Sequence, residues 1–269
     1  MKIIIHKNKL INLLDKEKKL GFVPTMGSLH AGHISLVKKC ISQCNKSIVT
    51  IFINKPQFNK INDYRKYPRS LRKDIKCLKK LKVNFLYIPL EKEIYPNGPN
   101  KKIKINSLSK KLCGRFRPGH FEAVVDVIDR FIKIINPKNI YLGEKDMQQL
   151  KIIEHFLKKN NKTTKVVKCK TIRNKSGIAL SSRNALLSIN EKIIASKIFK
   201  ILKNNKRNII KNKLNLTKVK KKIYKLGVSK IEYMKKINVN KLIKPYIKNN
   251  NYKIFISYYL GKTRLIDNI

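Results

Sequence analysis

Acidic residues, tryptophan and glycine are scarce in this chain of 269 residues, which has 15 Asp and Glu, no Trp and ten Gly. It also lacks any run of about 20 apolar residues that could cross a bilayer. Its start, Met-Lys-Ile-Ile-Ile-His at 1–6, has an apolar run that is too short and too soon interrupted by charge for a signal peptide. Five cysteines, an odd number without an export signal, argue against a disulfide framework. These absences exclude the secreted and membrane classes, and we expect a cytoplasmic protein.

The excess of positive charge does not by itself indicate a nucleic-acid-binding protein. A formal charge of +49 and a pI near 10.3 are typical of that class. However, 54 of the 64 basic residues are Lys, whereas proteins that read nucleic acids favour Arg for bidentate contacts. The lysines are spread along the chain and become denser over 156–269, which holds 31 basic and 3 acidic residues. We therefore favour compositional drift on solvated faces over a nucleic-acid surface.

Apolar patterning predicts alternating strands and helices in the first two thirds of the chain. Short runs rich in β-branched residues predict strands near 20–23, 47–53, 83–88, 139–142 and 164–170. Apolar residues at helical spacing predict helices near 32–44, 69–82, 119–135 and 145–158. This alternation is typical of an α/β fold with a doubly wound parallel sheet.

The pattern changes beyond Arg183. Two Lys-rich helical stretches and then two strand-like segments follow, near 189–204, 216–226, 228–239 and 251–259. This order predicts a second, smaller α+β domain. We place the first domain at 1–171 and the second at 172–269.

The most informative motif, Pro-Thr-Met-Gly-Ser-Leu-His-Ala-Gly-His at 24–33, lies between the first predicted strand and the helix after it. Ligands of open α/β sheets bind outside the carboxyl ends of the strands, and helix N-termini favour phosphate. His30 and His33 are two of only five histidines in the chain, and Gly32 lets the start of the helix approach a ligand closely. We interpret the motif as a phosphate site rather than a capping turn with incidental histidines.

Two other strand ends carry polar side chains. Asn54 and Gln57 follow the second predicted strand, and their neutral amides suit a small polar substrate. After the fourth predicted strand, Lys145 could neutralise phosphate charge, and Asp146 could hold a ribose hydroxyl or a magnesium-bound water. Gln149 lies one helical turn further on, facing the same way.

Three more Gly-, Pro- or Arg-containing motifs have open interpretations. Tyr-Pro-Arg at 67–69 is as consistent with a structural helix entry as with a functional role. The loop 112–121 could hold an anion or order a flap, and His120 could equally be a helix-start residue. Ser181, Ser182 and Arg183 offer two hydroxyls and a guanidinium to a polyphosphate.

Taken in order, these motifs resemble those of the pantothenate synthetases (pantoate–β-alanine ligases). The resemblance covers about 20–190 and resumes at 260–268. His-x-Gly-His alone marks a broad nucleotidyltransferase superfamily, whereas the ordered set is specific. The resemblance implies a Rossmann-like N-terminal domain, a small C-terminal lid and a cytoplasmic homodimer. It also implies two steps: the pantoate carboxylate attacks the α-phosphorus of Mg²⁺-ATP to give pantoyl adenylate and pyrophosphate, and β-alanine then displaces AMP.

The resemblance also implies roles for individual residues. His33 matches the family's catalytic proton donor, and Gln57 and Gln149 match its pantoate contacts, with Gln57 also contacting β-alanine. We add His30 and Lys145 as catalytic groups that stabilise phosphate charge, and Asn54 as a substrate contact. The implied ATP contacts are Met26, Gly27, Ser28, Leu29, His30, Ala31, Gly32, His33, Gly143, Glu144, Lys145, Asp146, Ile172, Leu180, Ser181, Ser182 and Arg183.

The sequence departs from the family pattern at Lys55, Cys113, Ala123, Asp126 and Ser176. It identifies no protein ligand for magnesium, because Asp74 is flanked by Lys73 and Cys77 where some members have metal-contacting side chains. One alternative is an adenylyltransferase of the same superfamily, but a phosphorylated acceptor would require cations where this chain has glutamines. The other alternative, a nucleic-acid-binding protein, predicts strongly salt-dependent binding.

Overall fold

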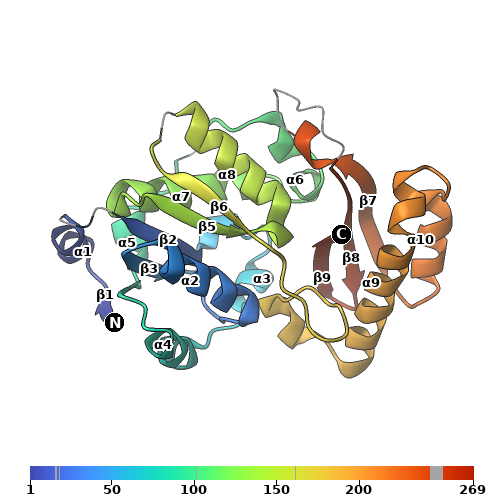
Figure 1. Cartoon of the computed structure of the whole chain (residues 1–269), viewed down its shortest axis with the longest axis horizontal. Helices are drawn as coiled ribbons and strands as arrows, with labels where there is room; N and C mark the ends of the chain where they lie inside the picture. The colour runs from blue at the N-terminus through green and yellow to red at the C-terminus, as the bar shows by residue number, and fades with distance from the viewer. Residues whose placement is uncertain (16, 18, 101, 161, 243–250) are drawn as a thin grey trace. The chain divides into compact units, whose positions relative to one another are not determined.

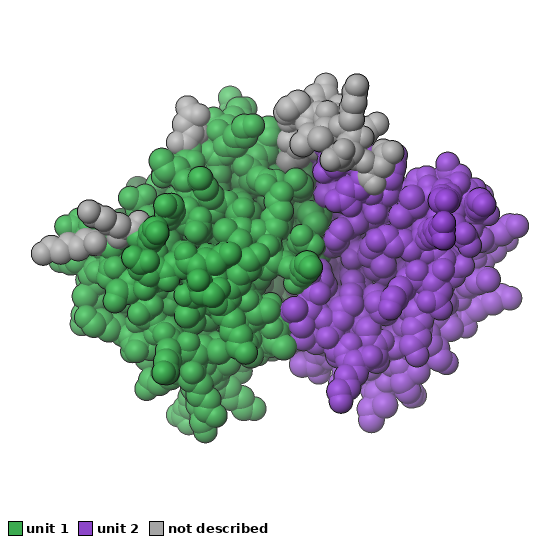
Figure 2. Space-filling model, in the orientation of Figure 1, with its two compact units in different colours: residues 1–170 green, residues 171–269 purple. Residues whose placement is uncertain are grey.

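The computed structural model describes residues 1–15, 17, 19–100, 102–160, 162–242 and 251–269. The chain forms two compact units, Met1–Lys170 and Thr171–Ile269, which Figure 2 shows in different colours. Among the described residues, no helix is both long enough and apolar enough to cross a membrane.

The first unit is built on a six-stranded sheet, and all of its strand pairs are parallel. The strands lie in the order β1-β4-β3-β2-β5-β6. Their bounds are β1 (Lys2–Ile4), β2 (Leu20–Thr25), β3 (Lys46–Ile51), β4 (Phe85–Tyr87), β5 (Asn139–Gly143) and β6 (Lys165–Cys169). All five strands predicted for this part of the chain are present, so the predicted α/β class with a doubly wound parallel sheet is confirmed.

Helices cover both faces of this sheet (Figure 1). The helices of this unit are α1 (Lys7–Leu14), α2 (Ala31–Gln43), α3 (Ile61–Arg65), α4 (Leu71–Lys80), α5 (Glu91–Ile94), α6 (Cys113–Phe116), α7 (His120–Ile135) and α8 (Met147–Lys159), with short 3₁₀ turns η1 (Lys55–Gln57), η2 (Ser107–Lys110) and η3 (Glu144–Asp146). Successive residues of β2 alternate between the two faces. Val23 packs with Leu36 and Val37 of α2, whereas the Phe22 ring contacts Phe131 of α7 edge-on, with 5.8 Å between ring centroids.

The strand order reverses between β2 and β5. From β2 the chain proceeds outward through β3 and β4, and then returns to place β5 and β6 on the other side of β2. Ligand sites of doubly wound sheets lie at such a switch point, outside the carboxyl ends of the strands. The motifs that follow β2, β3 and β5 therefore meet at one edge of the first unit.

The second unit packs two helices against an antiparallel sheet, as its predicted α+β character requires. It comprises η4 (Ser182–Leu186), α9 (Ile189–Ile210), α10 (Leu216–Tyr224), β7 (Lys230–Asn238), η5 (Val239–Lys241), β8 (Tyr252–Leu260) and β9 (Thr263–Asn268). The strands pair in the order β7-β8-β9. Alternate residues of β8, such as Ile254 and Ile256, share a core with Leu202 of α9 and Ile223 of α10.

Some predicted boundaries were wrong. The helix expected to end near residue 204 continues to Ile210, because Leu202 and Ile209 stay on its buried face. Neither β1 nor α1 was predicted, and β9 was missed as well. All three are short and carry charged or amide side chains among their apolar ones, which hides a strand or helix period.

Candidate active site

A strained turn joins β2 to α2 at the start of the main motif. The backbone φ angles are +77° at Gly27 and +51° at Ser28, both in the left-handed region. A Cβ on Gly27 would lie 3.1 Å from Ile51 Cγ2 and 3.2 Å from Asp74 Oδ2, so the position requires glycine. Thr25 Oγ1 braces the turn by accepting from the Gly27 N–H at 3.1 Å.

Asp74 holds this turn from α4. Its carboxylate is 2% exposed and accepts the backbone N–H groups of Ser28 at 2.8 Å and of Leu29 at 2.9 Å. The Ser70 hydroxyl donates to the same carboxylate at 3.1 Å. On the sequence alone, Asp74 was named only in noting that no protein ligand for magnesium could be identified, and this role was missed. The available signal was that Asp74 is the only acidic residue between positions 64 and 90.

We expect Asp74→Asn to lower the free energy of unfolding by about 2 kcal/mol, since hydrogen bonds to a charged group contribute about 1.5–3 kcal/mol. The amide cannot accept from both backbone N–H groups without turning its own N–H₂ toward one of them. Urea unfolding measures the change. Ser70→Ala is the matched control and should cost less, because it leaves both backbone contacts in place. An Asp74→Asn variant as stable as the native chain would contradict the bracing role.

His30 and His33 cap α2, and their rings lie against each other at a tilt of 36°. His30 Nδ1 accepts the Gly32 N–H at 3.1 Å, and His33 Nδ1 accepts the His30 N–H at 3.4 Å. Their ring centroids are 4.1 Å apart. Because each Nδ1 accepts a backbone N–H, the ring proton of each neutral imidazole is on Nε2. The capping interpretation and the phosphate interpretation are therefore compatible, since capping leaves one donor on each ring.

Both imidazoles are neutral near pH 7. Burial, reinforced by the positive charge of Lys145, lowers the pKa of His30 to about 4. Burial and the neighbouring His30 lower the pKa of His33 to about 3. Asp146 opposes the shift in both rings. The pair thus offers uncharged hydrogen-bond donors beside the cation of Lys145.

Asn54 is enclosed by protein, which differs from its predicted role as a substrate contact. It is 1% exposed, and its Nδ2 donates to Gln57 Oε1 and to the Ala123 carbonyl, both at 3.2 Å. Its Oδ1 accepts the Tyr95 hydroxyl at 2.7 Å. The Gln57 amide in turn lies 3.0 Å from Met26 Sδ. Asn54 therefore orients Gln57 beside the motif that follows β2.

Arg117 and His120 fix the backbone of Gln57. His120 Nδ1 donates to the Gln57 carbonyl at 2.8 Å, and Arg117 Nη2 donates to the same oxygen at 3.1 Å. Arg117 Nη1 lies 3.0 Å from His120 Nε2, which can accept in this tautomer. The structure therefore favours the structural interpretation of His120.

A third group of predicted site residues, 143–149, lies where β5 ends and α8 begins. Lys145 Nζ is 3.4 Å from Asp146 Oδ1. Gln149 is half-buried in the first turn of α8, whereas its neighbour Gln148 is buried and holds the loop before α6. Gln148 Oε1 accepts the Cys113 N–H at 3.0 Å, and its Nε2 donates to two carbonyls of that loop. Of the two amides, Gln149 is the one with access to a ligand.

The remaining predicted ATP contacts belong to the second unit, where they form a group of their own. The Leu180 N–H donates to the Ile172 carbonyl at 3.0 Å. Ser181 caps the turn η4, its Oγ accepting the Arg183 N–H at 3.3 Å. Ser182 and Arg183 follow within the same turn.

The described residues contain no group of three or more His, Cys, Asp or Glu side chains arranged to hold a metal ion. Asp146, whose side chain is 46% exposed, is available to a magnesium-bound water. Asp74 is not, because the turn occupies its carboxylate.

The positions that depart from the family pattern take part in local hydrogen bonds. Asp126 accepts from Arg130 Nε at 2.7 Å and from the Asn100 N–H at 2.8 Å. Ser176 Oγ donates to Asn174 Oδ1 at 2.8 Å. Lys55 begins the turn η1.

A comparison with known proteins shows which family this chain matches. The model of the family described as pantoate-beta-alanine ligase matches residues 2–269. The chain is 43% identical over 258 residues to the pantothenate synthetase of Francisella tularensis subsp. mediasiatica, covering 96% of this chain and 91% of that protein. The pantothenate synthetase of subsp. novicida is 42% identical over the same length and coverage.

Solved structures superpose on this chain along its whole length. The pantoate-beta-alanine ligase of Francisella tularensis, complexed with beta-gamma ATP and beta-alanine, superposes with a TM-score of 0.89 at 40% identity, covering 100% of this chain and 97% of that one. The pantothenate synthetase of Thermus thermophilus superposes with a TM-score of 0.89 at 28% identity, with coverages of 100% and 99%.

Proposed function

Because the chain belongs to the pantoate–β-alanine ligase family, we propose that it condenses pantoate with β-alanine at the expense of ATP through a pantoyl-adenylate intermediate. AMP and pyrophosphate are the other products. The ligase class predicted from the sequence is confirmed. The observation that carries the proposed mechanism is the pair of neutral, backbone-anchored histidines at the start of α2.

Adenylation requires charge stabilisation rather than a base, because the pantoate carboxylate is already ionised at neutral pH. One carboxylate oxygen bonds to the α-phosphorus, and pyrophosphate leaves with the electrons of the broken P–O bond. In our proposal, His30 and His33 donate from Nε2 to phosphate oxygens, and Lys145 supplies the positive charge. His33, matched to the family's proton donor, would then act as a neutral hydrogen-bond donor.

Pantoate would be held by the amides of Gln57 and Gln149. An amide can donate to a carboxylate and accept from a hydroxyl without placing a cation beside the nucleophile. Asn54 would act through Gln57, whose side chain it orients. The amine of β-alanine then attacks the acyl carbon of the adenylate, and AMP leaves with the bridging oxygen.

We also carry over from the family resemblance a set of ATP contacts that belong to the second unit. In this proposal Ile172 and the segment 180–183 contact ATP, and 172–269 acts as a lid on the Rossmann-like domain 1–171. The remaining ATP contacts are the motif 26–33 and the turn 143–146. Magnesium would enter with ATP and be held mainly by phosphate oxygens and water, and Asp146 lies close to the histidine pair.

We expect AMP and pyrophosphate, not ADP and phosphate, when the chain is incubated with ATP, pantoate and β-alanine. With ¹⁸O in the pantoate carboxylate, one labelled oxygen should appear in AMP, because the bridging oxygen of the adenylate comes from pantoate. Mass spectrometry of the nucleotide measures both outcomes. Label in inorganic phosphate, together with ADP, would mean an acyl phosphate and would contradict the adenylate mechanism.

Three sequence expectations remain predictions. The homodimer is testable by light scattering on the purified chain. The cytoplasmic location is testable by cell fractionation. Weak nucleic-acid binding is expected if the charge of +49 is drift, and a gel-shift titration measures it. The adenylyltransferase alternative predicts that each reaction ends with the transfer of AMP to a phosphorylated acceptor, without amide formation.

A further inference from the structure

A small hairpin precedes the serine-rich segment of the second unit. Asn174 N donates to the Ile178 carbonyl and Leu180 N to the Ile172 carbonyl, both at 3.0 Å. Arg173 and Ala179 face each other as an antiparallel bridge. The turn contains Gly177 at φ +91°, where a Cβ would overlap the Phe199 ring of α9. The hairpin therefore lies directly on α9.

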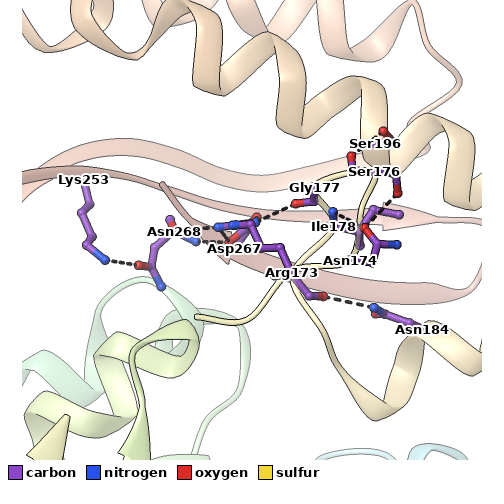
Figure 3. Close-up of polar contacts among 11 residues, drawn as sticks. Arg173, Asn174, Ser176, Gly177, Ile178, Asn184, Ser196, Lys253, Asp267 and Asn268 are labelled. Atoms are coloured by element: carbon purple, nitrogen blue, oxygen red, sulfur yellow. Dashed lines mark hydrogen bonds and ion pairs between the residues drawn. The ribbon is translucent and has the colours of Figure 1, made fainter. Parts of the chain in front are cut away.

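Arg173 ties this hairpin to the C-terminal strand (Figure 3). Nη1 donates to the Gly177 carbonyl at 3.1 Å and to Asp267 Oδ2 at 2.6 Å. Nη2 donates to Asp267 Oδ1 at 2.8 Å and to the Asn268 carbonyl at 3.3 Å. The guanidinium carbon also lies 4.4 Å from the centroid of the Phe199 ring. One side chain thus connects the first arm and the turn of the hairpin with α9 and β9.

These contacts identify the kind of role that Arg173 has. Four protein hydrogen bonds use the four N–H bonds of its two terminal nitrogens, so the guanidinium is not oriented to bind a phosphate. The Arg173 and Asp267 side chains are 20% and 12% exposed. A bidentate pair with this little solvent exposure fixes geometry more tightly than a single contact does. Arg173 is therefore built to hold the backbone around it.

The backbone that it holds leads into the proposed nucleotide contacts. Ile172 and Leu180, which flank the bridge of Arg173 and Ala179, are hydrogen-bonded to each other. Ser181, Ser182 and Arg183 follow immediately. Asn184 Nδ2 donates back to the Ala179 carbonyl at 3.1 Å, which closes the segment onto the hairpin. A displacement of the hairpin would therefore move both Ile172 and 180–183.

We propose that Arg173, held by Asp267, is a positioning residue for ATP: it orients Ile172 and the segment 180–183. This inference rests on the proposed function, in which that segment contacts the nucleotide. According to this inference, part of the affinity for ATP depends on the ion pair between Arg173, near the beginning of the second unit, and Asp267, near its end.

The test compares two ion pairs that each include a residue of β9. Arg173→Lys and Asp267→Asn should each raise the KM for ATP in the adenylation step by about tenfold, because misplaced contacts weaken binding, while the KM for pantoate stays nearly constant. Arg264→Lys and Glu232→Gln are the matched controls. Arg264 Nη2 lies 2.7 Å from Glu232 Oε2, with the side chains 17% and 4% exposed. The controls should lose stability, measured by urea unfolding, without a change in the KM for ATP.

The outcomes separate this inference from the function on which it rests. If Arg183→Ala raises the KM for ATP while Arg173→Lys and Asp267→Asn leave it unchanged, the positioning role is wrong and the proposed nucleotide contact stands. If Arg183→Ala, Ser182→Ala and the Arg173 variant all leave it unchanged, the nucleotide role of the segment is wrong and the inference falls with it. An equal rise in the control variants would show that Arg173 acts only through the stability of the unit.

Discussion

Replacing His33 by Ala is expected to slow pantoyl-adenylate formation by about 10²–10³-fold, and His30→Ala is expected to have a similar effect. Each imidazole is anchored at Nδ1 by a backbone N–H, which leaves its Nε2 proton for the ligand. Removing the ring removes a preorganised donor to charge that develops on the phosphate. Single-turnover formation of AMP measures the effect, and circular dichroism checks that the variant is folded.

Amide replacements distinguish hydrogen bonding from proton transfer. The side-chain nitrogen of Gln reaches approximately the position of Nε2, whereas that of Asn reaches approximately that of Nδ1. His33→Gln should therefore retain more activity than His33→Asn or His33→Ala. If His33 instead transfers a proton, none of the three variants should retain activity, because an amide does not titrate in this range.

The pH dependence follows from the same geometry. The pKa values of about 4 for His30 and about 3 for His33 lie below the ordinary 6.5, so both rings stay neutral until the pH falls below about 5. The adenylation rate should accordingly show no titration of these histidines between about pH 6 and about pH 8. An inflection in that interval that disappears in His33→Gln would contradict the neutral-donor role.

Replacing Gln149 by Ala is expected to raise the KM for pantoate by more than about tenfold and that for ATP much less, because its amide is proposed to hold the acid and not the nucleotide. Gln57→Ala should act in the same direction. It also leaves Asn54 without one of its partners, so part of its effect is local repacking. Replacing Gln149 therefore tests pantoate binding more directly than replacing Gln57 does. Initial rates at varied pantoate and varied ATP measure the two constants.

Variants that change the charge of a side chain provide the controls for this prediction. Gln149→Glu should weaken pantoate binding further than Gln149→Ala, because it places a carboxylate beside a carboxylate. Lys220→Ala and Lys221→Ala in α10 should leave both constants nearly unchanged if the surface charge is drift. Loss of activity in the lysine variants, with normal kinetics in the glutamine variants, would mean that the substrate site has been assigned to the wrong residues.

The local sequence pattern was sufficient to predict much of the fold and the positions of the motifs. The apolar runs of β2 and β3 predict buried parallel strands because side chains on both faces of such strands are covered. The rarity of Gly, His and Arg in a Lys-rich chain locates the motifs at strand ends. Since parallel strands share one carboxyl edge, the order of motifs along the chain already predicts that 26–33, 54–57 and 143–149 meet.

The roles of several residues depended on contacts that no local pattern contains. Asp74 reaches Ser28 across 46 positions, and Tyr95 reaches Asn54 across 41. These two contacts show Asp74 as a brace of the turn, which the sequence did not predict, and Asn54, a predicted substrate contact, as a buried partner of Gln57. The partner of a polar side chain depends on which elements pack together and in what register, so it is absent from the composition of the motif itself.

The sequence by itself determined the fold class and the positions where ligand chemistry concentrates, because periodicity and rare residues act over a few neighbouring positions. Only the tertiary structure decided which side chains face a ligand and which hold others in place. Arg173 and Asp267, 94 positions apart, show this most clearly. Their pairing exists only once β9 has docked beside β8 and the hairpin has closed on α9, since a buried hydrogen bond requires both partners at once.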